Sequence, residues 1–190
     1  MNVILASASP RRKEILSKMI ADFSVIPAEN ECALDPGLPP EEAVKRVAAS
    51  KAQAVFAEHP EDLVIGSDTA VLVDSTFLGK PQNEEEAKAM LRLLSGRSHR
   101  VLTAVAILSQ TKTSVFCDSA LVEFAPLAEE EIRAYVASGE PMDKAGAYGI
   151  QGLGGKFVTR IDGDFFTVMG LPCAKLYQAL KSFDILDVRR

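Results

Sequence analysis

The chain has 190 residues, of which 47% are hydrophobic and 25% are charged, and its net charge is −5. This composition is ordinary for a soluble globular protein and predicts one domain over residues 1–190, while the negative balance argues against broad binding to nucleic acid or acidic membranes. No hydrophobic run reaches the length of a membrane span, and the first residues lack the layout of a signal peptide, so we expect a cytoplasmic protein.

The first third of the chain alternates predicted strands and helices. Residues 2–6 and 23–27 favour short strands. A helix is predicted from Pro10 to Ile20, and a second from about Glu41 to Glu58.

The middle of the chain is richer in strands. Residues 62–74 are strand-rich and end in a turn near residues 74–76. Asn83 is predicted to cap a helix whose first turn carries three glutamates, as the helix dipole prefers. Strands are then predicted at residues 100–108 and 113–125.

The last third predicts a helix from Glu129 to Ser138, a glycine-rich stretch over residues 143–155, and a hairpin over Lys156–Met169 that turns on Asp162 and Gly163. A last helix begins at Pro172. Interleaved strands and helices predict an α/β fold around a mixed sheet.

The first predicted helix has three cations at its N-terminal end. Ser9 is a suitable N-cap and Pro10 suits the first helical position, yet Arg11, Arg12 and Lys13 follow directly. A helix N-terminus carries partial positive charge and prefers acidic neighbours. We therefore expect a negatively charged ligand at this end.

The cysteines and histidines do not indicate a transition-metal site. Cys32, Cys117 and Cys173 are far apart and odd in number, so we interpret them as reduced thiols. His59 and His99 have no paired-histidine spacing, and we expect both on the surface or in loops.

Polar residues interrupt two hydrophobic patterns. Lys51 falls in the hydrophobic stripe of its helix, where it either extends its ammonium to solvent or belongs to a site. Asp68 interrupts a strand expected to be buried, which favours a site over a solvated carboxylate at a bulge or a turn between two strands, marked by Gly66. Lys80 is either a surface lysine or a further site cation, and the glycine-rich stretch is either a tight turn or a loop that contacts a ligand.

Together these residues have the chemistry of a polyphosphate site. Arg11, Arg12, Lys51 and Lys80 supply cations, and Asp68 supplies a hard oxygen ligand. A polyphosphate with a magnesium-type ion requires both kinds of group.

Four segments resemble, in order and spacing, the Maf (septum formation) family of nucleoside triphosphate pyrophosphatases. They are "LASASPRRKEIL", "IGSDTAVLV", "LGKPQNEEEA" and "DKAGAYGIQG". The resemblance runs nearly end to end, and the last segment resembles the branch that acts on dTTP and UTP.

The resemblance implies an elongated single-domain α/β fold with a deep central cleft, similar to that of inosine triphosphate pyrophosphatases. It also implies a divalent metal (Mg²⁺ or Mn²⁺), a homodimer and a cytoplasmic location. Asp68 matches the family's catalytic acidic residue and a metal ligand. The other matching positions of the site are Ser7, Arg11, Arg12, Lys51, Thr69, Lys80 and Gln151.

One position departs from the family pattern. The family has a functional glutamate after the second strand, where "AENECAL" places Cys32. A shift of one residue assigns this role, as a metal ligand, to Glu31.

The implied reaction converts a nucleoside triphosphate and water to the monophosphate and pyrophosphate. Lys51 and Lys80 are expected to act with Asp68, while Arg11 and Arg12 bind the phosphates. The amide of Gln151, fixed by supporting hydrogen bonds, is expected to select dTTP and UTP over CTP and purine triphosphates. The alternatives are a nucleotide-binding regulator of cell division without turnover, and a pyrophosphatase for 7-methyl-GTP or inosine triphosphate.

Overall fold

A computed structural model describes residues 1–29 and 32–185. Contacts divide the chain into two compact units. The first unit contains residues 1–68, 103–118 and the described residues from Gly170 onward, and the second contains residues 69–102 and 119–169. The expectation of one domain over residues 1–190 stays a prediction.

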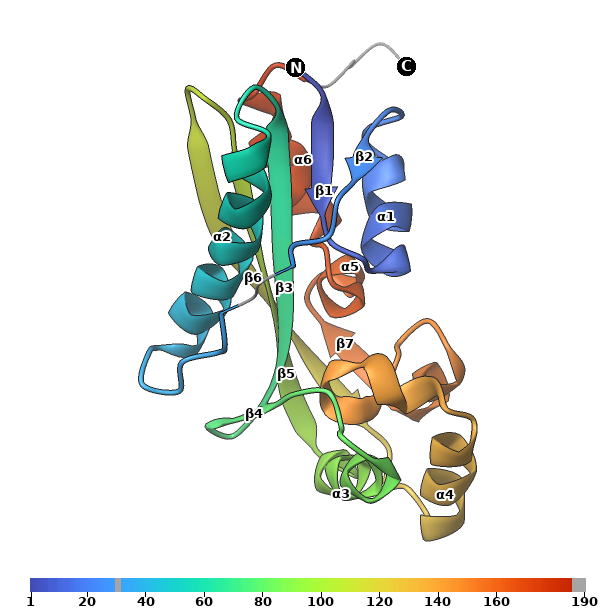
Figure 1. The fold of residues 1–190 in the computed structure, drawn as a ribbon. Coiled ribbons are helices and arrows are strands. Elements are labelled where there is room, and N and C mark those ends of the chain that lie inside the picture. The colour runs from blue at the N-terminus through green and yellow to red at the C-terminus, as the bar shows by residue number, and fades with distance from the viewer. Residues whose placement is uncertain (30–31, 186–190) are drawn as a thin grey trace. The chain divides into compact units, whose positions relative to one another are not determined.

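The structure has the predicted α/β class (Figure 1). The strands are β1 (Val3–Ala6), β2 (Ser24–Val25), β3 (Leu63–Val73), β4 (Thr76–Leu78), β5 (Ser98–Leu108), β6 (Thr113–Phe124) and β7 (Val158–Asp162). The α-helices are α1 (Pro10–Ser17), α2 (Pro40–Glu58), α3 (Glu84–Leu94), α4 (Glu129–Ala137), α5 (Phe165–Met169) and α6 (Cys173–Lys181). The 3-10 helices are η1 (Glu140–Asp143), η2 (Ala145–Ala147) and η3 (Leu153–Phe157). No helix in the described part of the chain is long and apolar enough to cross a membrane.

The strands form one mixed sheet in the order β2-β1-β3-β5-β6-β7, with β4 paired to β3. β1 is parallel to both β2 and β3, whereas β4 pairs antiparallel with β3 and β7 pairs antiparallel with β6. This arrangement confirms the predicted mixed sheet.

In the first unit, α2 presses closely on β3 (Figure 1). A Cβ atom at Gly66 would lie 2.6 Å from the carbonyl oxygen of Ala48 and 2.7 Å from the backbone nitrogen of Ala52, so only glycine fits between strand and helix. The helix also buries Val44 and Val47. The close approach brings the middle of α2 next to the centre of β3.

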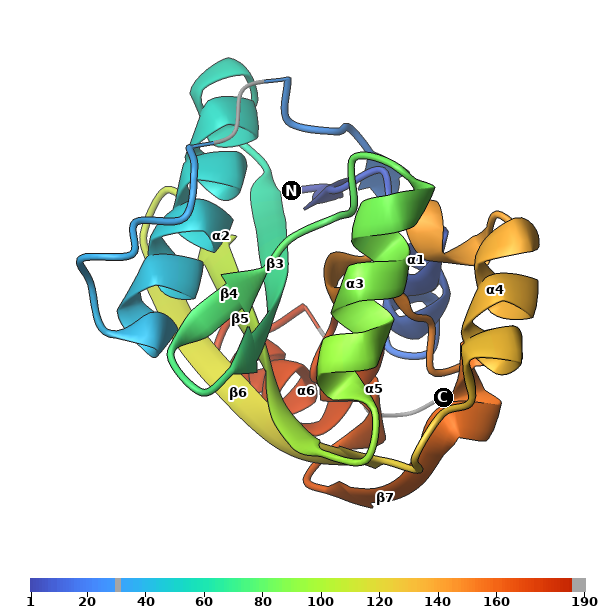
Figure 2. The same cartoon turned by 90° about the horizontal axis from the view of Figure 1, so that it is seen from below.

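The second unit has its own hydrophobic core, and both α3 and α4 contribute residues to it. The two helices contact each other (Figure 2). The Asn83 side chain accepts a hydrogen bond from the Glu86 backbone N–H at 2.9 Å, so the predicted cap of α3 is confirmed. Gly96 follows α3 with φ 65°, a left-handed conformation that suits glycine.

Two predicted elements differ from the structure. The hairpin over Lys156–Met169 is wrong, because β7 pairs with β6 and residues Phe165–Met169 form α5. The Asp164 side chain accepts a hydrogen bond from the Phe166 backbone N–H at 2.8 Å, which favours a helical turn after Gly163. α1 ends at Ser17 rather than at Ile20, because the Met19 backbone N–H turns back to the Leu16 carbonyl at 2.9 Å.

The three cysteines are free thiols, as predicted, and each is half-buried. Burial raises the pKa of the Cys117 thiol to about 11. A thiol with a raised pKa is a poor nucleophile at neutral pH, so Cys117 is not suited to nucleophilic chemistry.

The expectation for His99 is wrong, because this residue is buried in β5. His99 Nε2 lies 2.8 Å from the Tyr148 hydroxyl, and the ring makes edge contacts with Tyr148 and Phe124. Its Nδ1 is buried and has no hydrogen-bond partner among the described residues. Burial lowers the pKa of His99 to about 4, since the charged imidazole would lose its hydration.

The buried His99 predicts a pH-dependent stability. Between pH 6.5 and 4 the unfolded chain binds a proton at this residue and the folded chain does not, so its contribution is complete above pH 6.5 and is lost as the pH falls toward 4. The expected loss is about 3 kcal/mol of unfolding free energy. Urea unfolding at a series of pH values should show a flatter pH dependence for His99→Gln than for the wild type. Parallel curves for the two proteins would contradict this assignment.

Candidate active site

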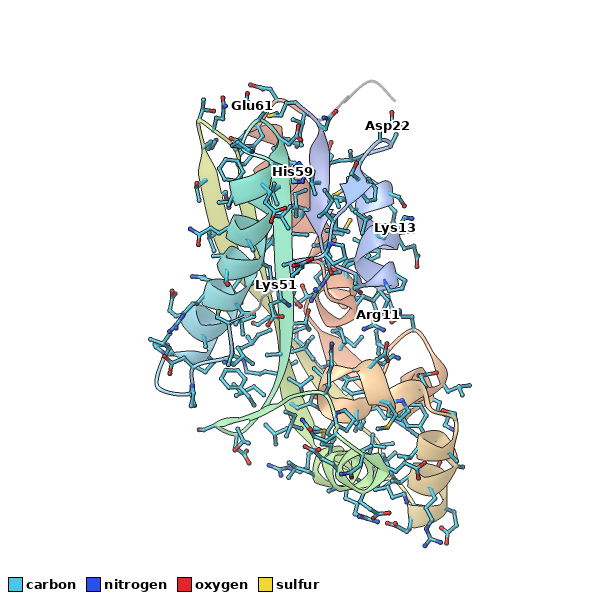
Figure 3. The ribbon with its side chains drawn as sticks, viewed as in Figure 1. Arg11, Lys13, Asp22, Lys51, His59 and Glu61 are labelled. Atoms are coloured by element: carbon cyan, nitrogen blue, oxygen red, sulfur yellow. The ribbon has the colours of Figure 1, made fainter. Side chains whose placement is uncertain are left out.

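Lys51 and Asp68 form a buried ion pair in the first unit. Lys51 Nζ lies 2.7 Å from Asp68 Oδ1, and the two side chains are 9% and 14% exposed. Figure 3 shows Lys51 extending from α2 toward β3. The solvent-directed interpretation of Lys51 is therefore wrong, and β3 runs through Asp68 as one strand, so no turn divides it there.

The pair is better explained as part of a site than as a source of stability. Removing both charges from water costs free energy that offsets much of their attraction. Lys51 instead fixes one oxygen of the Asp68 carboxylate at a defined position on β3. A carboxylate held in this way is suited to orient a water molecule or to bind a hard cation.

A hydrogen-bond network joins the start of α1 to the residue before Asp68. Arg12 Nε donates to the Gly170 carbonyl at 2.8 Å, and Arg12 Nη1 donates to Ser7 Oγ at 3.1 Å. The Ser67 hydroxyl donates to the same Gly170 carbonyl at 3.1 Å. Gly170 has φ 110°, a conformation that few other residues adopt. Arg12 therefore has a structural role, because it joins Ser7 to the Gly170 carbonyl even without a ligand.

Arg11 differs from Arg12 in its surroundings. It lies at the N-terminal end of α1 (Figure 3) and is half-buried like Arg12, but its side chain has other surroundings. Within the described ranges its guanidinium has no ion-pair or hydrogen-bond partner. The Ser9 side chain caps the helix by accepting from the Arg12 backbone N–H at 3.5 Å, and the first turn contains no acidic residue. This end of α1 combines a cation with helix N–H groups, as anion sites do.

These two arginines provide a matched pair of stability predictions. Arg11→Ala is expected to leave the unfolding free energy unchanged or to raise it by about 0.3–1 kcal/mol, because a cation is unfavourable at a helix N-terminus. Arg12→Ala is expected to lower it by about 1.5–3 kcal/mol, because two charge-assisted hydrogen bonds are lost. Thermal unfolding without ligand measures both. A marked loss of stability in Arg11→Ala would show that this arginine is structural.

His59 cannot serve as the base of this site. It lies at the C-terminal end of α2, toward the opposite end of the first unit from Arg11 (Figure 3). Its half-buried position after the helix agrees with the loop position that the sequence predicts.

Three of the predicted site residues belong to the second unit. Thr69 follows Asp68 in β3 and is half-buried, while Lys80 and Gln151 are exposed. Among the described residues, no hydrogen bond from the Gln151 amide is found, so the supporting hydrogen bonds expected from the sequence are not there. The glycine-rich stretch consists of the short η2 and η3 and the turn between them.

Asp68 is the one predicted metal ligand that lies within the described residues, because Glu31 falls outside them. No cluster of three or more histidine, cysteine or acidic side chains that could hold a metal exists in residues 1–29 and 32–185. Magnesium sites that bind nucleotides need only one or two carboxylates, since substrate phosphates and water complete the shell. The Asp68 carboxylate thus fits a hard ion such as Mg²⁺ or Mn²⁺, and not a metal that prefers sulfur or imidazole ligands.

The mixed sheet and the buried Lys51–Asp68 pair define an α/β protein with an acidic site on a central strand. The family model described as Maf-like protein matches residues 2–183, and the chain belongs to this family.

Individual relatives agree with the family assignment. A Bacillus velezensis protein named dTTP/UTP pyrophosphatase is 53% identical over 183 residues, which cover 96% of this chain and 97% of the relative. A Bacillus mycoides protein with the same name is 51% identical over 182 residues, or 96% of this chain and 95% of the relative. The solved structure of the Staphylococcus aureus Ham1 protein matches 97% of this chain and 100% of that chain, with a TM-score of 0.52 and 15% identity. This last likeness shows the fold alone.

Proposed function

We propose that the chain is a nucleoside triphosphate pyrophosphatase that hydrolyses dTTP and UTP to the monophosphate and pyrophosphate. The observation that carries the proposal is the Asp68 carboxylate, fixed by Lys51 on β3 in a chain about half identical to proteins named for this activity. The homodimer and the cytoplasmic location implied by the resemblance stay predictions.

In the proposed reaction, water attacks the α-phosphorus of the substrate. The bond from this phosphorus to the oxygen that bridges the α- and β-phosphates breaks, and pyrophosphate leaves with the electron pair. Asp68 orients the water and accepts its proton, while Lys51 holds the carboxylate in position. Arg11 and the N–H groups of α1 bind phosphate oxygens.

A Mg²⁺ or Mn²⁺ ion held by Asp68 and the substrate phosphates would supply charge neutralisation and polarise the phosphorus. Glu31 is the second proposed metal ligand. Arg12 is proposed to support Ser7 and the phosphate-binding end of α1 through the contacts described above. For Thr69, Lys80 and Gln151 the proposed roles in substrate binding and charge stabilisation rest on the resemblance.

A nucleotide panel in water labelled with ¹⁸O tests the reaction. With Mg²⁺ or Mn²⁺ and UTP or dTTP, the expected products are the monophosphate and pyrophosphate, with the label in the monophosphate. Label in pyrophosphate would place the attack at the β-phosphorus, and orthophosphate as the direct product would refute the proposal. Binding of UTP without turnover would favour a regulator, and faster hydrolysis of 7-methyl-GTP or inosine triphosphate would favour the other alternative.

Gln151 supplies a prediction about base choice. Its amide offers one donor and one acceptor, which match the carbonyl and N3–H of uracil and thymine. Gln151→Ala is expected to lower kcat/KM for UTP and dTTP by about 10- to 100-fold, as expected for lost polar contacts worth about 1–3 kcal/mol, and to affect GTP less. Because no described residue holds the amide, it can turn to match cytosine, and CTP should be the next best substrate. An equal loss for all four nucleotides would limit Gln151 to supporting its loop.

A further inference from the structure

The carboxylate of Glu140 organises the turn that contains Gln151. Glu140 lies at the first position of η1 in the second unit. Its Oε2 accepts a hydrogen bond from the Leu153 backbone N–H at 2.8 Å, and its Oε1 accepts one from the Gly154 backbone N–H at 3.1 Å. Burial alone would raise the pKa of Glu140, but these two backbone hydrogen bonds and that from Tyr135 outweigh it and lower the pKa, so the group is ionised at neutral pH.

The Tyr135 hydroxyl extends this contact to the other side of the turn. It donates to Glu140 Oε1 at 2.9 Å and accepts from the Gly149 backbone N–H at 3.1 Å. The tyrosine itself is 2% exposed and packs edge-on against Phe157. The buried Tyr135 side chain of α4 thus anchors the turn, because its hydroxyl bonds both to Glu140 Oε1 and to the Gly149 backbone N–H.

The turn lies so close to the Glu140 carboxylate that a side chain at its centre would displace that carboxylate. A Cβ atom on Gly152, the residue after Gln151, would come within 2.6 Å of three Glu140 carboxylate atoms. A Cβ atom on Gly154 would lie 2.6 Å from the Tyr135 hydroxyl. The backbone before and after Gln151 therefore packs directly against the Glu140 carboxylate and the Tyr135 hydroxyl.

These anchors leave the Gln151 side chain itself exposed. The fixed points are the backbone at residues 149, 153 and 154, which bracket Gln151 without contacting its amide. Such an arrangement fixes where the side chain starts and in which direction it leaves the backbone. Because the turn is already ordered, binding of a ligand does not carry the entropic cost of ordering it.

We propose that Glu140, supported by Tyr135, is a positioning residue for pyrimidine selection, because its carboxylate fixes the backbone from which Gln151 reaches the base. This inference rests on the role of Gln151 in the proposed function. In this inference Glu140 contributes to base selection although it contacts neither the base nor the reacting phosphates.

The test measures binding of the non-hydrolysable α,β-methylene analogues of UTP and GTP by calorimetry, so it does not depend on turnover. Glu140→Gln keeps the shape of the side chain but replaces one acceptor oxygen with an NH₂ group that faces an N–H donor. The ratio of UTP-analogue to GTP-analogue affinity is expected to fall about tenfold, and amide hydrogen exchange at Leu153 and Gly154 to become faster. Tyr135→Phe leaves both backbone contacts of Glu140 and should cause a smaller fall. Glu130→Gln, an equal change of charge at an exposed position in α4, is the matched control and should leave the ratio unchanged.

A double-mutant cycle decides whether Glu140 acts through Gln151. In the Gln151→Ala background, Glu140→Gln is expected to cause no further fall in the affinity ratio. A further tenfold fall in that background, an equal loss for both analogues, or a wild type without pyrimidine preference would overturn the inference. If Glu140→Gln does not fold, Glu140→Asp replaces it, because it keeps the charge and draws the oxygens away from the turn. Absence of pyrophosphate from UTP would refute the proposed function alone, because the binding ratios would still test Glu140.

Discussion

Asp68→Asn is expected to lower kcat by about 10²- to 10⁴-fold, the range for loss of a general base. Asparagine has nearly the same shape, and its side-chain oxygen still accepts a hydrogen bond from Lys51 Nζ. The substitution removes the negative charge that proton transfer and cation binding require. Steady-state hydrolysis of UTP at saturating Mg²⁺ or Mn²⁺ measures the effect.

Thermal unfolding provides the control for this prediction. The variant should remain folded, because the hydrogen bond between positions 51 and 68 is retained and no cavity is created. Retention of most of the wild-type kcat would exclude Asp68 from catalysis. A variant that is inactive only because it is unfolded would be recognised by its melting curve.

Lys51→Met is expected to lower the unfolding free energy by about 3–5 kcal/mol, the usual cost of removing one member of a buried ion pair. For a chain of this length the corresponding fall in Tm is about 10 °C. Methionine fills most of the volume of the lysine stem, so the loss comes from the Asp68 carboxylate, which is 14% exposed and would lack its cation. Urea unfolding at neutral pH measures the change.

The double variant Lys51→Met/Asp68→Asn separates this effect from lost packing. With both charges removed, most of the stability should return, while turnover stays absent. If the double variant is as unstable as Lys51→Met alone, the lysine stem and not the ion pair stabilises this contact. Wild-type stability of Lys51→Met would show that the carboxylate needs no partner.

The two residues at the centre of the candidate site were predictable because they break regular patterns. A lysine in the hydrophobic stripe of a helix and an aspartate in a buried strand are each unusual, and the structure places them 2.7 Å apart. The cap of α3 was predictable as well, since an asparagine followed by three glutamates is a local signal.

Residues that act through distant contacts gave no comparable signal. Ser67 and Gly170 meet through a hydrogen bond between positions 103 residues apart. In the sequence nothing distinguishes Glu140 from other acidic residues that follow a helix. Its role depends on the hydrogen bond from the Leu153 backbone N–H, which only the structure shows. The predicted hairpin was wrong for the same reason, because the partner of β7 is β6, which lies earlier in the chain.

The division of the chain between its two units has a consequence for the order in which the protein is made. The first unit contains the beginning of the chain, residues 103–118 and the segment from Gly170, whereas the second ends at Met169. During synthesis, every residue of the second unit has been added before the first unit receives Gly170, whose carbonyl joins Arg12 and Ser67. Contacts between residues far apart in the sequence carry a large entropic cost of loop closure and form slowly. Arg12, which supports the phosphate-binding end of α1 in the proposed reaction, therefore lacks the acceptor of its Nε in a ribosome-bound fragment that stops before Gly170.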